Sequence, residues 1–212
     1  MSKILTVFGA TGNQGGSVIR AVLADEVLSR EFTVRGVTRD VDKPAARALA
    51  AQGVEMVQPG FFMSNLLGFI RKSPDGLVWP MPEGVSLHEA QLPLLDAARD
   101  TGLFVKAAMK HFPDTAGTRI LAATDYYSPA RIVAELQEVT GKKVSYVETP
   151  HDVFKESLPG SAAQEMLENM LLLQDPGYYA GADLRPSLQL LDPDDKPVTW
   201  KAFAQQNKDK WE

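Results

Sequence analysis

The stretch VFGATGNQGGSV at residues 7–18 places glycines at positions 9, 12 and 15, directly after an apolar run. Gly9 would permit a tight turn, Gly12 would let a pyrophosphate approach the backbone, and Gly15 would allow close packing of a helix on a strand. The free N–H groups and the positive dipole end of that helix would attract phosphate. The pattern predicts a phosphate cradle, with a purely structural turn as the alternative. Its candidate cofactor-binding residues are Gly9, Thr11, Gly12, Asn13, Gln14 and Gly15.

A second candidate region is VRGVTRDVDK at residues 34–43, where a predicted strand ends. In dinucleotide-binding folds this position carries an acidic residue for a ribose 2′-hydroxyl or an arginine for a 2′-phosphate. The planar guanidinium of Arg39 suits a phosphate, and Lys43 follows close by, whereas Asp40 is a competing acidic signal. The order of these residues favours NADP(H) over NAD(H), unless Arg39 and Lys43 are only solvated surface groups.

These candidate residues need a sheet edge and helix ends to position them, and the local patterns supply both. Short apolar runs predict strands, and stretches with apolar residues at helical spacing predict helices. The first 57 residues therefore predict strands over 3–8, 32–37 and 54–57, separated by helices over 13–24 and 42–52. A β-α-β-α-β order of this kind is the signature of a parallel doubly wound sheet in an α/β protein.

After residue 58 the pattern changes, because Pro59 and Gly60 follow the third strand at once and no further βα unit of the sheet is predicted. The remaining chain predicts shorter elements. Ser86 with Glu89 forms a capping-box pattern for a helix that Pro93 should shorten. Expected strands cover 120–123 and 143–147, and expected helices cover 129–140, 161–174 and a stretch from residue 199.

Three stretches, VFGATGNQGGSV, VRGVTRDVDKPAARALAAQGVEMVQ and PGFFMSNLL, resemble the NmrA-like family of atypical short-chain dehydrogenases. The resemblance covers almost the whole chain. It implies an NADP-binding Rossmann domain, whose N-terminal part is residues 1–58, and a C-terminal NmrA-like lobe at 59–212. It also implies that the middle of the family's Rossmann domain is absent between Gln58 and Pro59. The family includes members that sense redox state and members that act as reductases.

The resemblance does not carry over a complete active site. Short-chain dehydrogenases use a tyrosine with a lysine four residues later, which lowers the pKa of the tyrosine for proton transfer. None of the five tyrosines in this sequence has lysine at that spacing, so the catalytic residues stay unassigned. The resemblance does imply a small-molecule pocket lined by Phe61, Phe62 and Asn65. Packing of this segment in the core is the alternative.

Composition limits the other function classes. The chain has 212 residues, a net charge of −5, no cysteine and no stripe of basic residues. We therefore expect no direct nucleic-acid or membrane partner and no thiol chemistry. The three histidines lack metal-ligand spacing, and the aspartates in LDPDDKPVTW are more simply a proline turn than a metal site. We expect no signal peptide, and a cytoplasmic location with the nucleus as the alternative.

Taken together, the sequence favours an NADP(H)-binding protein with a regulatory or redox-sensor role and without classical dehydrogenase catalysis. One alternative is an NAD(P)H-dependent reductase or isomerase of a small organic molecule, and another is a protein that binds no nucleotide and acts through protein contacts. The break after Gln58 predicts a bare edge on the first strand. We expect a homodimer to cover that edge, rather than the C-terminal lobe, with residues 61–63 at the interface.

Overall fold

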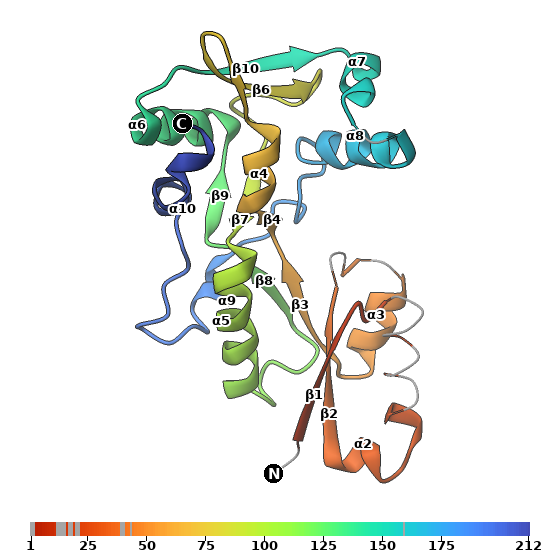
Figure 1. The fold of residues 1–212 in the computed structure, drawn as a ribbon. Helices are drawn as coiled ribbons and strands as arrows, with labels where there is room; N and C mark the ends of the chain where they lie inside the picture. Colours follow the sequence, from red (N-terminus) through yellow and green to blue (C-terminus); the bar gives the residue numbers. More distant parts are fainter. Residues whose placement is uncertain are drawn as a thin grey trace. The chain divides into compact units, whose positions relative to one another are not determined.

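The computed structural model describes the chain except residues 1–2, 12–15, 17–18, 20–21, 39–40, 43 and 159, and only the backbone of Glu55 and Ser161. The chain is an α/β protein that folds into two compact units, each assembled from segments distant in sequence (Figure 1). The first unit comprises Met1–Gly60, Ala98–Ala122 and Leu184–Lys196. The second comprises Phe61–Ala97, Ala123–Asp183 and Pro197–Glu212.

The first unit is built on a parallel sheet with the strand order β1-β2-β3-β8. Its strands are β1 (Lys3–Phe8), β2 (Phe32–Val37), β3 (Glu55–Pro59) and β8 (Arg119–Ala122). Its helices are α2 (Leu28–Glu31), α3 (Pro44–Ala51), α5 (Ala97–Lys110) and α9 (Arg185–Leu188). The expected parallel sheet of the first 57 residues is therefore confirmed. Of the helix expected over 13–24, the described residues Gly16, Ile19 and 22–24 are helical.

Apolar side chains explain why these segments come together. Val7 on β1, Val34 on β2 and Met56 on β3 lie on one face of the sheet, in a buried cluster with Leu49 of α3. Removal of this apolar surface from water is the main favourable contribution to the packing. Helix α3 ends at Ala51, one residue before the predicted end at residue 52. Gly53, the predicted stop, adopts a φ of +77° and turns the chain into β3.

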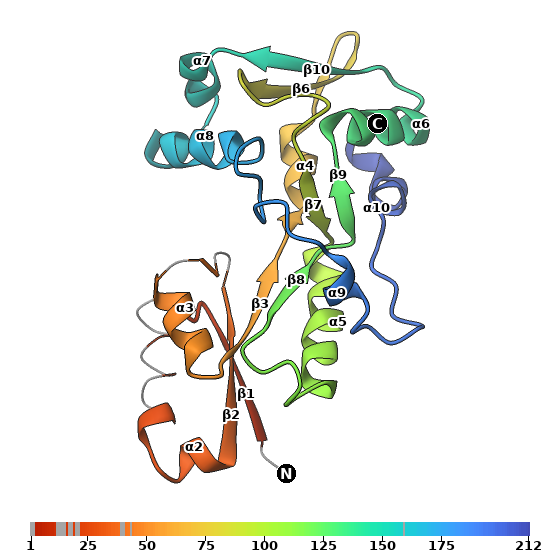
Figure 2. The same cartoon turned by 180° about the vertical axis from the view of Figure 1, so that it is seen from behind.

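The fourth strand of this sheet corrects the expectation that nothing after residue 58 would extend it. The stretch around Ile120 was expected as a strand of the C-terminal lobe. Instead, β8 pairs in parallel with β3, with Val57 opposite Ile120 (Figure 2). An apolar run predicts a buried strand but does not identify the strand beside it, since pairing partners are set by the tertiary fold.

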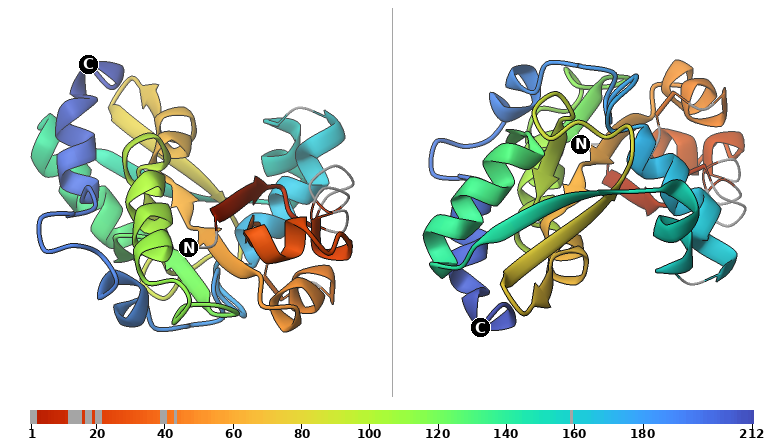
Figure 3. Two further views of the ribbon diagram at one scale, coloured as in Figure 1. Left: turned by 90° about the horizontal axis from the view of Figure 1, so that it is seen from below. Right: turned by 90° about the horizontal axis from the view of Figure 1, so that it is seen from above.

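The second unit contains two small sheets, with strand orders β10-β6-β5 and β4-β7-β9. Figure 3 shows the long parallel pair of β6 and β10 in its right-hand view. The strands are β4 (Phe61–Phe62), β5 (Arg71–Ser73), β6 (Gly76–Pro82), β7 (Leu92–Leu95), β9 (Asp125–Tyr127) and β10 (Val144–Thr149). The α-helices are α4 (Met63–Phe69), α6 (Pro129–Thr140), α7 (His151–Glu156), α8 (Ala163–Leu171) and α10 (Trp200–Gln206).

Capping residues define several helices of this unit. The Ser128 hydroxyl accepts a hydrogen bond from the N–H of Arg131, and Gly141 ends α6 with a φ of 69°.

The helix expected after Ser86 does not form. The Ser86 hydroxyl accepts a hydrogen bond from the N–H of Glu89, but the chain makes only a turn there before it enters β7. A capping hydrogen bond therefore does not start a helix when the next residues pair as a strand. The helix expected over 161–174 is shorter, because α8 ends at Leu171.

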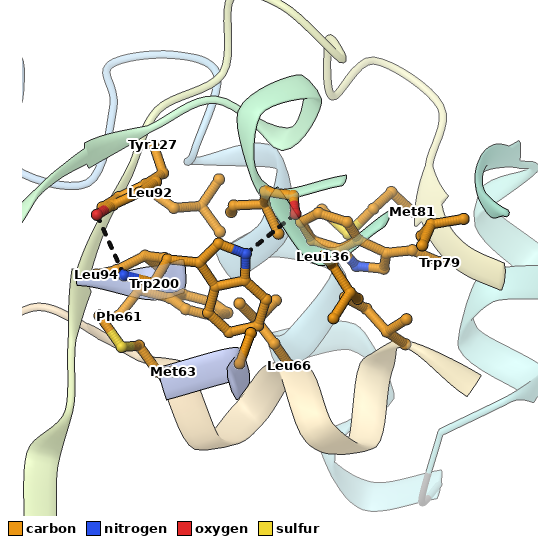
Figure 4. Close-up of a cluster of buried hydrophobic side chains, with 14 of the residues drawn as sticks. Phe61, Met63, Leu66, Trp79, Met81, Leu92, Leu94, Tyr127, Leu136 and Trp200 are labelled. Atoms are coloured by element: carbon orange, nitrogen blue, oxygen red, sulfur yellow. Dashed lines mark hydrogen bonds between the residues drawn. The ribbon is translucent and has the colours of Figure 1, made fainter. Parts of the chain in front are cut away.

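The core of the second unit is organised around Trp200, which is fully buried (Figure 4). Its indole N–H donates to the carbonyl oxygen of Ile132 at 3.0 Å, and its backbone N–H donates to the Tyr127 hydroxyl at 3.2 Å. Phe61 and Met63 belong to the same core. The expectation that residues 61–63 form an intermolecular interface is therefore wrong for Phe61 and Met63, because the core of their own unit buries both side chains.

Candidate functional site

The carboxyl edge of the first unit's sheet is the candidate site. All four strands run parallel, so their carboxyl ends lie along one edge. In open α/β sheets, ligands bind outside this edge. The loops that leave β1, β2 and β3 there begin with Gly9, Thr38 and Gly60.

Backbone hydrogen bonds continue from strand to strand along this edge. The N–H of Ala10 donates to the carbonyl oxygen of Val37 at 3.1 Å, so the loop after β1 is attached to the end of β2. The N–H of Thr38 donates to Val57 at 3.4 Å, and that of Gly60 donates to Ala122 at 2.9 Å. The start of each loop is therefore fixed by the neighbouring strand.

The turn after β1 depends on two glycines. Gly9 adopts a φ of +63°, a left-handed conformation that favours glycine, and the next residue, Ala10, is completely buried. A Cβ atom on Gly36 of β2 would lie only 2.8 Å from the Cβ of Ala10. Gly36 therefore gives the turn the space to lie against β2. Gly36 is not among the site residues predicted from the sequence, although a glycine inside a strand pattern is a signal of close backbone approach.

A pair of threonine hydroxyls joins the two loops predicted to bind the cofactor. The Oγ1 atoms of Thr11 and Thr38 lie 3.3 Å apart, and either hydroxyl could donate the hydrogen bond. Thr11 belongs to the glycine-rich loop, and Thr38 immediately precedes Arg39. The contact fixes the position of the first loop relative to the end of β2. The sequence did not predict this pairing, because the two residues are distant in sequence.

Charged side chains gather beside the loop between β2 and α3. An oxygen of Asp42 lies 3.4 Å from Nη2 of Arg47 and 3.7 Å from Nη1 of Arg119. Arg119 also donates through its Nη2 to Oε1 of Gln58 at 3.3 Å. These groups are partly exposed, so ions screen them substantially. Two arginines, one from α3 and one from β8, therefore approach the carboxylate of Asp42.

The predicted site residues fall into three groups. Gly9 and Thr11 lie at the carboxyl edge, as described above. Phe61, Phe62 and Asn65 belong to the second unit, where Phe61 is in the core while Phe62 and Asn65 are exposed. Gly12, Asn13, Gln14, Gly15, Arg39 and Lys43 lie outside the described residues.

Asp192 and Asp195 make ion pairs with lysines of α5. Asp192 lies 2.6 Å from Lys110 and 3.2 Å from Lys106, and Asp195 also pairs with Lys106. Hydrogen bonds from Lys110 and Lys106 lower the pKa of the Asp192 carboxyl. These carboxylates tie the segment after α9 to α5. Among the described residues there is no group of three or more histidine, cysteine, aspartate or glutamate side chains arranged to hold a metal ion.

Two of the three histidines, His111 and His151, contact backbone carbonyl oxygens through their rings. His111 lies 3.1 Å from the carbonyl oxygen of Leu190 through its Nε2 atom, and His151 lies 2.8 Å from that of Glu83. Each ring joins two segments of its own unit. In the part of the chain that the structure describes, no helix has both the length and the apolar character needed to cross a membrane.

Comparison with known proteins gives consistent matches in sequence. The model of the NmrA-like family matches residues 1–59 and 56–204. An NmrA-like family domain-containing oxidoreductase of Malbranchea aurantiaca, malD, is 36% identical over 110 residues, which cover 48% of this chain and 32% of that protein. The oxidoreductase FrzB of a Cladobotryum species is 35% identical over 112 residues, covering 49% and 32%. The chain thus spans about a third of the length of these curated relatives.

Solved structures show the same fold. NmrA, a negative transcriptional regulator crystallised with NADP, aligns with a TM-score of 0.59 and 15% identity over 97% of this chain and 95% of that chain. An NADPH-dependent quinone oxidoreductase from Escherichia coli, crystallised with NADPH, aligns with a TM-score of 0.58 and 16% identity over 96% and 99%. At these identities the likeness shows a Rossmann-like fold and no more.

Proposed function

This chain belongs to the NmrA-like family, and we propose that it binds NADP(H) at the carboxyl edge of its first unit in a regulatory or redox-sensor role. The observation that carries the proposal is the turn from Gly9 to Thr11, which is held against Gly36 and Thr38 at that edge. A turn of this kind after the first strand is where dinucleotide-binding folds receive a pyrophosphate.

The residues present suit the cofactor. Backbone N–H groups of the loop from Gly9 to Gly15 would hold the pyrophosphate, and Arg39 with Lys43 would hold the 2′-phosphate. Arg47 and Arg119 add positive charge near that second loop. Bound NADPH supplies hydride-donating chemistry, whereas the residues of the chain itself bind and orient the phosphates. Support also comes from the NADP and NADPH bound to the two structural relatives described above.

A reductase function is the second candidate, because the relatives similar in sequence are named oxidoreductases. In that case Phe62 and Asn65, whose side chains are exposed, would contact a small organic substrate. The lack of a tyrosine with lysine four residues later favours the regulatory role instead.

The absorbance of NADPH distinguishes the two candidates. The protein is mixed with NADPH and, in turn, with a panel of quinones, imines and carbonyl compounds. The regulatory proposal predicts stoichiometric binding of NADPH without its consumption above the rate of a protein-free control. Steady oxidation of NADPH that depends on one of the substrates, and that Phe62→Ala reduces, would support the reductase instead.

A further inference from the structure

The two edges of the first unit's sheet differ in how they are protected. At one edge, the backbone N–H of Leu121 in β8 donates to the Ser187 hydroxyl at 2.8 Å, and α9 packs on the strand. At the other edge, β1 pairs with β2 alone. Within the ranges that the structure describes, no group hydrogen-bonds to the outer side of β1.

The open edge is suited to pairing with another strand. β1 has six residues, KILTVF, with neither proline nor glycine, and its single charge is at its first residue, Lys3. Natural proteins normally protect such an edge with charges, prolines or bulges. At its last residue, the side chain of Phe8 is 66% exposed. Both the backbone and this side chain therefore lack the protection that an edge strand usually has.

We propose that two copies of this chain associate through β1, antiparallel and edge to edge. A two-fold axis perpendicular to the sheet gives this arrangement, and it keeps the same face of the sheet on the same side in both copies. The residue on the axis then lies opposite itself. Because β8 is covered by α9, association stops at a dimer and does not continue into a filament.

Phe8 selects the register of the pair. With Thr6 on the axis, Phe8 lies opposite Ile4 of the second copy, and Leu5 lies opposite Val7. Aromatic side chains beside β-branched ones, and threonine beside threonine, are favourable cross-strand pairs. With Leu5 on the axis instead, Lys3 lies opposite Val7 and Phe8 extends beyond the ladder. Registers centred on Val7 or Phe8 also cover Phe8, but they shorten the ladder from five residues of β1 to three or one. The register centred on Thr6 is therefore the longest one that covers Phe8.

Charge also fits this arrangement. The strand contributes one lysine per copy, and antiparallel pairing places the two lysines at opposite ends of the ladder. The Lys3 ammonium already has local partners, since it pairs with Glu31 and lies 5.6 Å from the centre of the Phe32 ring. No like charges therefore meet along the paired strands.

A cysteine substitution tests the register directly, because the chain has no cysteine of its own. In Thr6→Cys the two cysteines would face each other with Cα atoms about 4.5–5.5 Å apart, within the range for a disulfide. In the control, Ile4→Cys, the same ladder keeps the cysteines about 14 Å apart. The proposal predicts a covalent dimer on mild oxidation of Thr6→Cys and none of Ile4→Cys. Equal cross-linking of both variants, or of neither, would overturn it.

The oligomeric state provides an independent measurement. In sedimentation velocity the unmodified chain should behave as a dimer of the 23.2 kDa chain at micromolar concentration. Phe8→Lys should raise the dimer dissociation constant about tenfold or more, since two apolar pairs are lost. Val153→Lys adds the same charge at an exposed apolar position of α7 and should leave the dimer unchanged. A chain that sediments as a monomer at every concentration, or a Phe8→Lys variant as dimeric as the original, contradicts the proposal.

Discussion

The hydroxyl oxygens of Thr11 and Thr38 lie 3.3 Å apart, across the gap between the first loop of the sheet and the end of its second strand. In the proposed function, Thr11 belongs to the loop that holds the pyrophosphate, and Thr38 precedes the arginine that holds the 2′-phosphate. The hydrogen bond would then keep the two phosphate-binding loops at a fixed separation before the cofactor arrives. Preorganisation of this kind improves affinity because less ordering is required on binding.

Thr38→Val tests that role. Valine keeps the shape of threonine but cannot form the hydrogen bond, so NADPH affinity should fall by about 0.5–1.5 kcal/mol, or about 2- to 10-fold. Thr38→Ser should retain most of the affinity. In a double-mutant cycle, adding Thr11→Val to Thr38→Val should cause little further loss. Fully additive losses would show that the two hydroxyls act independently.

Gly36→Ala tests the packing of the turn on β2. The new Cβ would lie 2.8 Å from the Cβ of Ala10, so the turn or the strand must shift. We expect the free energy of unfolding to fall by about 1–3 kcal/mol, as for other overpacked cores, and NADPH binding to weaken. In the control Gly102→Ala, no atom lies within 4 Å of the new Cβ in α5, and helix propensity favours alanine. Urea unfolding measures both, and equal stability of Gly36→Ala and the unmodified chain would contradict the packing argument.

Arg39→Ala tests the choice of cofactor. A charge-assisted hydrogen bond to a 2′-phosphate is worth about 1.5–3 kcal/mol, so the unmodified chain should prefer NADPH over NADH by about 10- to 100-fold. The variant should lose most of this preference through weaker NADPH binding, with NADH binding little changed. Equal affinity of the unmodified chain for the two cofactors would mean that Arg39 is only a surface residue.

Acid should weaken the first unit through Asp192. Lys110 and Lys106 lower the pKa of this carboxyl in the folded chain, so the unfolded chain binds its proton more tightly. The resulting stabilisation is complete above the unfolded pKa of about 3.9 and is lost as the pH falls through the lower folded value. Asp192→Asn should therefore reduce the dependence of the melting temperature on pH in the acid range. Asp194→Asn, at an exposed neighbouring position, should leave that dependence as it is.

Local sequence patterns were enough to predict β1, β2, β3, α3 and α6, because each has its own apolar periodicity and end signals. They could not place β8 beside β3, since strand pairing depends on contacts far apart in sequence. For the same reason, the sequence did not identify Gly36 and Arg119 as residues of the candidate site. Gly36 matters only once Ala10 packs on it, and Arg119 only once β8 brings it near Asp42.

The central claim is that the glycine-rich loop after β1 binds NADP(H), and calorimetric titration with NADPH tests it most directly. The unmodified chain is titrated alongside Gly12→Val, which would place a side chain where the pyrophosphate should lie. We predict one NADPH bound per unmodified chain and no measurable binding by Gly12→Val, with unchanged circular dichroism. Absence of binding by the unmodified chain, or equal affinity of both proteins, would contradict the claim.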